Sequence, residues 1–232
     1  MSIDDRIAAV ISLLQCATRD YAPVAFASSF GAEDMVLTDF IARHAPEIGI
    51  FTLDTGRLPE ETHRLMQTTA ERYQVRVRTY YPDNKALEQY QTAHGINAFY
   101  RDVELRQQCC HIRKVEPLKR ALAGKRAWIT GLRREQAPGR QAVAESAFDD
   151  DYGLQKFNPL ADWSNAEVWE YVKRFDVPYN ALHERGYPSI GCAPCTRAIT
   201  VGEDPRAGRW WWENEGGKEC GLHERARVAQ PA

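Results

Sequence analysis

The chain has 232 residues, of which 44% are hydrophobic and 27% are charged, and this balance is typical of one large globular domain. A formal net charge of -2 excludes binding to nucleic acid or to a membrane surface through bulk electrostatic attraction. No apolar run is long enough to cross a bilayer, and the first residues lack the basic-then-apolar layout of a signal peptide. We therefore expect a cytoplasmic protein without a membrane or nucleic-acid partner.

Strand-like and helix-like segments alternate along most of the chain. Apolar residues at helical spacing predict an opening helix around residues 7–14. The segments expected to be strands or extended are 24–27, 47–53, 75–82, 126–132 and 154–163. The further segments expected to be helical are 35–42, 59–73, 83–95, 109–124 and 164–175. The last of these begins at Ser164, which is followed three residues later by Glu167 as in a capping box.

This alternation predicts an α/β fold with a parallel, twisted sheet and helices on both faces. Ligands in such sheets bind beyond the carboxyl ends of the strands. After Pro178 the sequence becomes rich in Gly, Pro, Arg and Trp and loses its periodicity. We expect an irregular C-terminal segment there, with a mobile end.

Two polar loops follow the first two expected strands. The loop SSFGAED, Ser28 to Asp34, presents small and hydroxylated residues at the start of a helix, where backbone N–H groups can bind an anion. It is neither a Walker A motif nor a dinucleotide fingerprint, and an ordinary capped turn is an equal alternative. The turn LDTGRLPEE, Leu53 to Glu61, should lie beside it at the same sheet edge. Together the two loops favour a nucleotide site.

Four of the six cysteines form two pairs, which are adjacent in CCHIRK and separated by two residues in GCAPC. The paired residues are Cys109, Cys110, Cys192 and Cys195. Four thiolates can hold zinc or a [4Fe–4S] cluster, and the separate iron corners of the cluster suit adjacent ligands better. Four unrelated thiols or a redox-active CxxC are the alternatives. Cys16 fits a small buried hydrophobic residue.

Cations recur near the cysteines and the expected loops, and an unpaired cysteine lies near the C-terminus. The cations are Arg113, Lys114, Arg133, Arg134, Arg140, Arg197, Arg206 and Arg209. Guanidinium groups suit sulfate and phosphate oxygens, although some of these arginines will form surface salt bridges. In KECGLH, Cys220 lies between Lys218 and His223, which favour its thiolate. Cys220 is therefore a candidate nucleophile.

This ordered series of motifs resembles the assimilatory sulfonucleotide reductases, and specifically the iron–sulfur branch that reduces adenylyl sulfate (APS). The motifs that match in order are SSFGAED, LDTGRL, CCHIRKVEPLKRAL, TGLRREQ, NPLADWS, GCAPCTR, GRWWWE and KECGLH. The resemblance implies an adenine-nucleotide alpha-hydrolase-like fold. It divides the chain into a sulfonucleotide-binding domain with the cluster site, 1–205, and a flexible catalytic tail, 206–232.

The resemblance also implies residue roles. The cluster ligands would be Cys109, Cys110, Cys192 and Cys195, which bind [4Fe–4S]. The nucleotide contacts would be Ser28, Ser29 and Gly31 at the phosphates and Leu53, Asp54 and Gly56 at the adenosine. The sulfate end would be surrounded by Lys114, Arg140, Arg206, Arg209 and His223. Cys220 would be the nucleophile.

The implied reaction is the reduction of APS to sulfite and AMP through an S-sulfocysteine on Cys220, with thioredoxin or glutaredoxin as reductant. A homo-oligomer is expected from the family. A reductase of phosphoadenylyl sulfate (PAPS), or of both nucleotides, is the nearest alternative. A tRNA-thiolating ATP pyrophosphatase is more distant, because its glycine-rich SGGxDS loop is missing. A zinc-stabilised interaction module without turnover is the non-enzymatic alternative.

Overall fold

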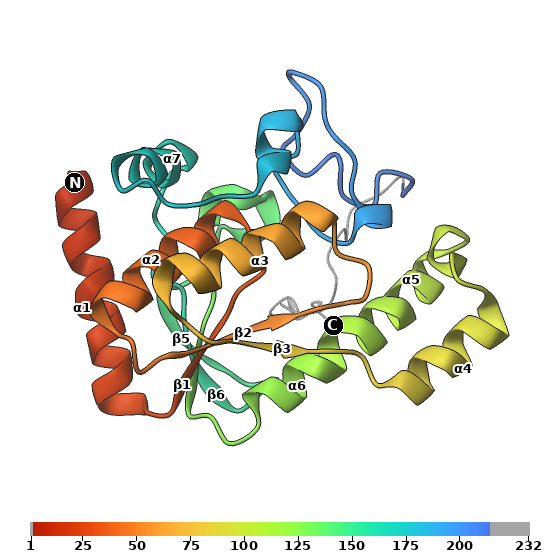
Figure 1. Ribbon diagram of the computed structural model, residues 1–232, viewed down its shortest axis with the longest axis horizontal. Helices are drawn as coiled ribbons and strands as arrows, with labels where there is room; N and C mark the ends of the chain where they lie inside the picture. The colour runs from red at the N-terminus through yellow and green to blue at the C-terminus, as the bar shows by residue number, and fades with distance from the viewer. Residues whose placement is uncertain (1, 214–232) are drawn as a thin grey trace, which may run out of the picture.

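The computed structural model describes residues 2–213, and its centre is a six-stranded sheet of order β3-β2-β1-β4-β6-β5 (Figure 1). The strand bounds are β1 Val24–Ala27, β2 Gly49–Leu53, β3 Val77–Tyr80, β4 Ala127–Ile129, β5 Ser146–Asp149 and β6 Leu154–Phe157. The pairs β3-β2, β2-β1, β1-β4 and β4-β6 are parallel. The α/β fold with a parallel sheet that the sequence predicts is therefore confirmed for these four strand pairs.

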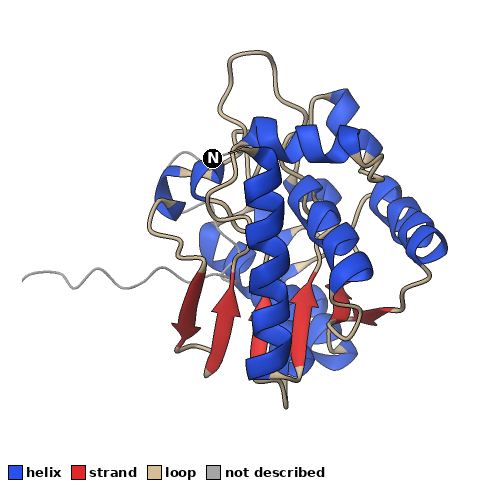
Figure 2. Cartoon of the chain, turned by 90° about the vertical axis from the view of Figure 1, so that its left-hand side faces the viewer, coloured by secondary structure: helices blue, strands red, loops and turns tan. Residues whose placement is uncertain are grey.

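Helices cover both faces of this sheet (Figures 1 and 2). Their bounds are α1 Ile3–Tyr21, α2 Ala32–His44, α3 Glu60–Tyr73, α4 Asn84–His94, α5 Val103–Cys110, α6 Glu116–Leu122 and α7 Asn165–Arg174. The larger core joins α1, α2, α3 and α7 to one face, with Phe26 and Ile129 among its buried residues. The smaller core packs α6 against the other face through Leu118 and Trp128. Alternate residues of one strand thus serve opposite cores, as the twofold repeat of a strand requires.

One strand runs against the prediction of a wholly parallel sheet. Strand β5 pairs antiparallel with β6 as an edge hairpin, with Ala147 opposite Lys156. Ser146, Ala147 and Phe148 are all exposed, so this strand lacks the buried apolar alternation that reveals a strand in a sequence. A short connection is available to antiparallel strands only, which explains how β5 fits between β4 and β6 in the chain.

The expected helix 109–124 is part of a longer irregular one. Helix α5 begins at Val103, capped by Asp102, and leads without a break into a π-helical segment, His111–Val115, and then α6. Wide turns of this kind occur mostly at functional sites. The segment after Pro178 is irregular as expected, with short 3-10 turns at Ala181–Arg185 and Ala193–Cys195.

No helix within residues 2–213 is long and apolar enough to cross a membrane. The predicted nucleophile Cys220 and its neighbour His223 lie outside the described residues. The proposed boundary at residue 205 stays a prediction.

Candidate active site

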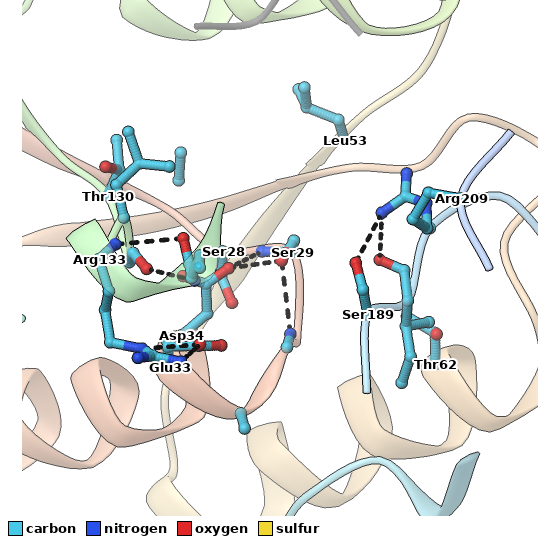
Figure 3. Close-up of a pocket in the computed structure, with 18 of the residues that line it drawn as sticks. Ser28, Ser29, Glu33, Asp34, Leu53, Thr62, Thr130, Arg133, Ser189 and Arg209 are labelled. Carbon is cyan, nitrogen blue, oxygen red and sulfur yellow. Dashed lines mark hydrogen bonds and ion pairs between the residues drawn. The ribbon is translucent and has the colours of Figure 1, made fainter. Parts of the chain in front are cut away.

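A pocket of about 520 Å³ lies beyond the carboxyl ends of β1, β2 and β4. Figure 3 shows two sides: Ser28, Ser29 and Asp34 on one, and Ser189 and Arg209 on the other. Eight of the residues predicted from the sequence line this pocket: Ser28, Ser29, Gly31, Leu53, Lys114, Arg140, Arg206 and Arg209. Folding therefore brings together the first loop, the end of β2, the π-helical segment and the C-terminal arginines at one pocket.

The loop after β1 is held in shape by a buried carboxylate. Asp34, in the first turn of α2, accepts hydrogen bonds from the backbone N–H of Ser29 at 2.5 Å and from its hydroxyl at 2.6 Å. Burial raises the pKa of Asp34 to about 6, although the bonds from Ser29 favour the charged form. A Cβ at Gly131 would lie 2.2 Å from the Asp34 carboxylate, so only glycine fits there. The open N-terminus of α2 begins at Gly31 and faces the pocket as an anion-binding end.

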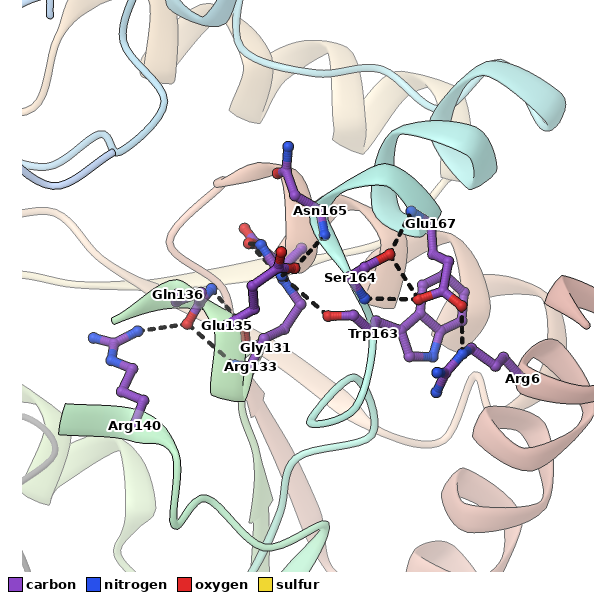
Figure 4. Close-up of polar contacts among 11 residues, drawn as sticks. Arg6, Gly131, Arg133, Glu135, Gln136, Arg140, Trp163, Ser164, Asn165 and Glu167 are labelled. Atoms are coloured by element: carbon purple, nitrogen blue, oxygen red, sulfur yellow. Dashed lines mark hydrogen bonds and ion pairs between the residues drawn. The ribbon is translucent and has the colours of Figure 1, made fainter. Parts of the chain in front are cut away.

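Beside this loop lies an ion pair between Glu33 of α2 and Arg133, which follows β4 (Figure 3); Figure 4 shows Arg133 with its neighbour Trp163. Arg133 donates through Nε and Nη2 to one oxygen of Glu33, at 2.9 and 2.7 Å, and through Nη1 to the Trp163 carbonyl at 3.0 Å. Burial is the largest single effect and favours the neutral form of Glu33, but the charge of Arg133 and the hydrogen bonds from Gln136, from the backbone and from Arg133 together lower the pKa of Glu33. The pair anchors the pocket wall and leaves little of Arg133 for a ligand.

The residues of the turn after β2 have two roles: some line the pocket, and others hold the turn in its conformation. Leu53, Thr55 and Leu58 line the pocket, whereas the predicted contacts Asp54 and Gly56 do not. The Asp54 carboxylate accepts from the backbone N–H of Gly56 at 2.8 Å and lies 2.9 Å from Nε2 of His63. Gly56 has a φ of +67°, which favours glycine. These two residues shape the turn that presents Leu53.

The four paired cysteines gather behind this turn. Cys109, Cys110 and Cys192 are buried and Cys195 is half-buried. The Cys192 sulfur lies 3.2 Å from the Thr55 hydroxyl, and burial together with the charges of Cys192 and Cys110 raises the pKa of Cys195 to about 12. Within the described part of the chain, no three His, Cys, Asp or Glu side chains are close enough to hold a single metal ion.

Two cations connect the cysteines to the pocket. Lys114 and Arg209 both line the pocket, and both lower the pKa of Cys195 against the effect of its burial. Arg209 is buried and donates through Nη1 to the Ser189 hydroxyl and the Ile190 carbonyl, each at 3.3 Å. Its Nε has no hydrogen-bond partner in residues 2–213. A Cβ at Gly191 would lie 2.3 Å from this guanidinium group, so the guanidinium packs directly against the Gly191 backbone and no larger residue fits there.

An arginine stack supports Arg209 from behind. Two guanidinium groups lie over the Trp210 ring: that of Arg209 at 4.7 Å and that of Arg106 at 4.8 Å from the ring centroid. Arg106 is 1% exposed and pairs with Glu213. This buried charge pair fixes the C-terminal segment onto α5 and so holds Arg209 at the pocket.

Sequence reasoning missed several pocket residues as site candidates. They are Glu33, Asp34, Thr130, Gly131, His183 and Ser189, whereas Arg133 was predicted as one of the cations near the expected loops. The group after β4 could have been found, because residues at the carboxyl end of a parallel strand face the ligand edge. His183 could not, because its segment has no periodic pattern. Cys16 lies in α1, within hydrogen-bond distance of Asp20, and does not line this pocket.

The fold and this pocket define an adenine-nucleotide alpha-hydrolase-like protein whose nucleotide edge is flanked by cysteines and arginines. The family model of the phosphoadenosine phosphosulfate reductase domain matches residues 23–198, and the chain belongs to that family.

Curated relatives and solved structures agree with this membership. The chain is 55% identical to an adenosine 5'-phosphosulfate reductase of Allochromatium vinosum, covering 97% of this chain and 88% of the relative. It is 58% identical to one of Burkholderia cepacia, covering 86% and 80%. A phosphate complex of a PAPS reductase from Candida auris superposes with a TM-score of 0.71 at 27% identity, covering 85% and 98%. An FMN adenylyltransferase of Candida glabrata bound to ATP shares the fold alone, with a TM-score of 0.58 at 15% identity over 82% of this chain and 61% of that one.

Proposed function

We propose that this protein reduces APS to sulfite and AMP in assimilatory sulfate reduction, using electrons from a thioredoxin-type dithiol protein. One observation carries the proposal: a loop suited to phosphate and the cations Lys114 and Arg209 face one pocket, directly beside four clustered cysteines. The names of the relatives at 55% and 58% identity point to the same nucleotide.

The four cysteines fit a [4Fe–4S] cluster better than a zinc ion. A cubane offers four separate iron corners, which suits adjacent ligands such as Cys109 and Cys110. Buried donors next to the cysteines lack partners in the described chain, namely Nε of Arg113 and Nε1 of Trp212. Cluster sulfurs would accept from such donors. The bound cluster would supply order and a fixed charge distribution beside the pocket.

The pocket residues would bind and orient the nucleotide. Ser28, Ser29 and Gly31 would hold the phosphate at the N-terminus of α2, and Leu53 would contact the adenosine. Asp54 and Gly56 would act through the shape of the turn, because the Asp54 carboxylate is already bonded to the backbone N–H of Gly56. The resulting pose would direct the sulfate towards the cysteine side.

The sulfate end would then be surrounded by Lys114, Arg206 and Arg209, with Arg140 at the pocket wall. The Cys220 thiolate would attack the APS sulfur and expel AMP, which leaves an S-sulfocysteine. Attack by an anion on an anion requires positive charge placed in advance, which Lys114 and the buried guanidinium group of Arg209 would provide. His223 would assist at the same end. A partner thiolate would attack the Cys220 sulfur and release sulfite.

The test is mass spectrometry of the anaerobically purified protein mixed with APS or PAPS and no reductant. We expect a sulfite-sized mass increase on Cys220 with APS, no increase in Cys220→Ser, and an unchanged increase in the control Cys16→Ser. An adduct on another cysteine would contradict the role of Cys220. Equal or faster formation with PAPS would contradict an APS-specific enzyme and favour the PAPS or dual alternative.

Iron and sulfide analysis of the same preparation tests the cluster. Four irons and four sulfides per chain are expected for a fully loaded [4Fe–4S] site. A colourless protein with one zinc would contradict it and revive the zinc-module alternative. Release of pyrophosphate from ATP would revive the tRNA-thiolation alternative. The cytoplasmic location, the homo-oligomeric state and the choice between thioredoxin and glutaredoxin stay predictions.

A further inference from the structure

An exposed apolar surface lies beside the cysteine cluster and has no role in the pocket. It is formed by Ile96, Tyr100 and Val103, between and at the ends of α4 and α5, together with Trp211. Their exposed fractions are 61%, 40%, 47% and 48% in that order, which is high for large apolar side chains. We call this the α4–α5 surface; none of its residues lines the nucleotide pocket.

The surface is rigid and is joined to the cysteine loop. The Tyr100 hydroxyl donates to the Pro194 carbonyl, in the middle of the CAPC turn, at 2.8 Å. The Tyr100 ring lies 4.5 Å from that of Trp212, and the Trp211 ring lies 5.7 Å from Trp212, so Trp212 bridges the two exposed aromatics. Beneath them Phe99, Cys109 and Cys195 belong to one apolar cluster. Such preformed aromatic surfaces lose little side-chain entropy when they bind a partner.

The α4–α5 surface lies close in the chain to the predicted nucleophile Cys220, and this indicates which kind of partner approaches it. Cys220 follows Glu213 by seven residues, so covalent geometry keeps its Cα within about 25 Å of that of Glu213. Trp211 stands two residues before Glu213. Any protein that attacks the sulfur of Cys220 must therefore dock near the end of the described chain. The α4–α5 surface is an exposed apolar area near that end, because it includes Trp211.

We propose that the α4–α5 surface is the docking site of the dithiol reductant; this inference rests on the proposed function. A partner that delivers electrons and leaves needs a small interface that is also stable in water when empty, and a few exposed apolar side chains around a rigid aromatic pair meet both needs.

The docked reductant would release sulfite from Cys220 in two thiol-exchange steps. One thiolate of the partner attacks the Cys220 sulfur, the bond from that sulfur to the sulfite group breaks, and sulfite leaves with the electron pair. The second partner cysteine then attacks the mixed disulfide. This step releases the Cys220 thiolate and leaves the partner as a disulfide, oxidised by two electrons.

The experiment starts from the S-sulfo protein made with APS, and measures its reduction by thioredoxin and by dithiothreitol. We compare Ile96→Asp and Val103→Asp, singly and together, with a matched control, Phe148→Asp. Phe148 is also 61% exposed but lies on β5, at the sheet edge opposite β3. Tyr100 is left intact because it holds the cysteine loop.

We expect the second-order rate constant with thioredoxin to fall about ten- to thirty-fold in the double variant, which is the size of effect that loss of an interface hot spot produces. The rate with dithiothreitol, the rate of adduct formation and the Phe148→Asp values should all match the unmodified protein. An unchanged thioredoxin rate would overturn the proposal.

The α4–α5 surface could instead be covered by another part of this chain or by a second copy of it. Each of these alternatives predicts a different result, and either result would also overturn the proposal. If the protein's own residues 214–232 pack on this surface, adduct formation with APS should slow. If a second copy of the chain covers it, sedimentation should show a smaller assembly in the double variant. Failure of the unmodified protein to form any adduct with APS would instead contradict the proposed function itself.

Discussion

The two sides of the pocket differ in whether their buried polar groups are satisfied. On the strand side, Asp34 accepts from Ser29, and Glu33 pairs with Arg133. On the cysteine side, several buried donors lack partners within residues 2–213; they are Nε of Arg113, Nε of Arg209, Nε1 of Trp210 and Nε1 of Trp212. An unsatisfied buried donor costs about 1–3 kcal/mol, so the acceptors of a bound cluster or substrate would stabilise the cysteine side. On the strand side, the two buried carboxylates of Asp34 and Glu33 already have partners within the protein.

The largest expected effect is on the cysteine side, where Cys192→Ser removes a proposed cluster ligand and its contact with Thr55. We expect loss of iron and sulfide, loss of adduct formation and a lower melting temperature, because buried donors such as Nε of Arg113 and Nε1 of Trp212 would stay without cluster acceptors. Cys16→Ser, in α1, should change none of these. Iron analysis, mass spectrometry and thermal melting measure them. An iron-replete variant would mean that Cys192 is not a ligand.

Next in size is the buried pair on the strand side. Arg133→Met leaves the Glu33 carboxylate without its guanidinium partner, and we expect a loss of about 3–5 kcal/mol in the free energy of unfolding. The neighbouring Arg134→Met is the control, since its partnership with Asp162 lies at the surface and should contribute less than about 1 kcal/mol. Denaturant unfolding measures both. Equal losses would show that burial of Glu33 is not the decisive factor.

The third effect concerns Arg209, the buried cation that lies between the pocket and the cysteines. Arg209→Gln removes the charge while keeping a donor near Ser189, and we expect adduct formation with APS to slow about 10²–10³-fold. Arg197→Gln, whose side chain is 40% exposed and pairs with Glu203, is the matched control and should be close to unmodified protein. Rapid-mixing mass spectrometry follows the adduct. A loss in both variants would point to general damage of the C-terminal segment.

The smallest effect is a pH dependence of stability. The folded pKa of Asp34 is about 6, above its ordinary value of 3.8, so between these values the folded state holds more protons than the unfolded state. Stability from this group is full below about pH 4 and falls by about 3 kcal/mol as pH rises through 6. Asp34→Asn should remove that fall. Exposed Asp20, whose pKa is lowered to about 2, titrates below this window, so Asp20→Asn should keep it.

Much of the strand side was predictable because its signals are local. The apolar runs before Ser28 and Asp54 marked strands, and the capping box of Ser164 and Glu167 was found where expected, with the Glu167 N–H donating to the Ser164 hydroxyl. Polar loops after neighbouring parallel strands must share a sheet edge. Strand β5 escaped prediction because it is exposed and gains its structure only from pairing with β6.

The sequence by itself determined the α/β fold, the four paired cysteines and the cations that accompany them, because hydrophobic periodicity, residue type and the order of motifs are local properties of the chain. Only the tertiary structure decided that Asp54 shapes a turn rather than lining the pocket, that Arg133 is engaged by Glu33, and that Arg209 is the cation held against Trp210. These roles depend on a contact across one hundred residues, as between Arg133 and Glu33, or on how a side chain is oriented relative to its near neighbours in the chain. Only packing selects among the partners that a local pattern leaves open.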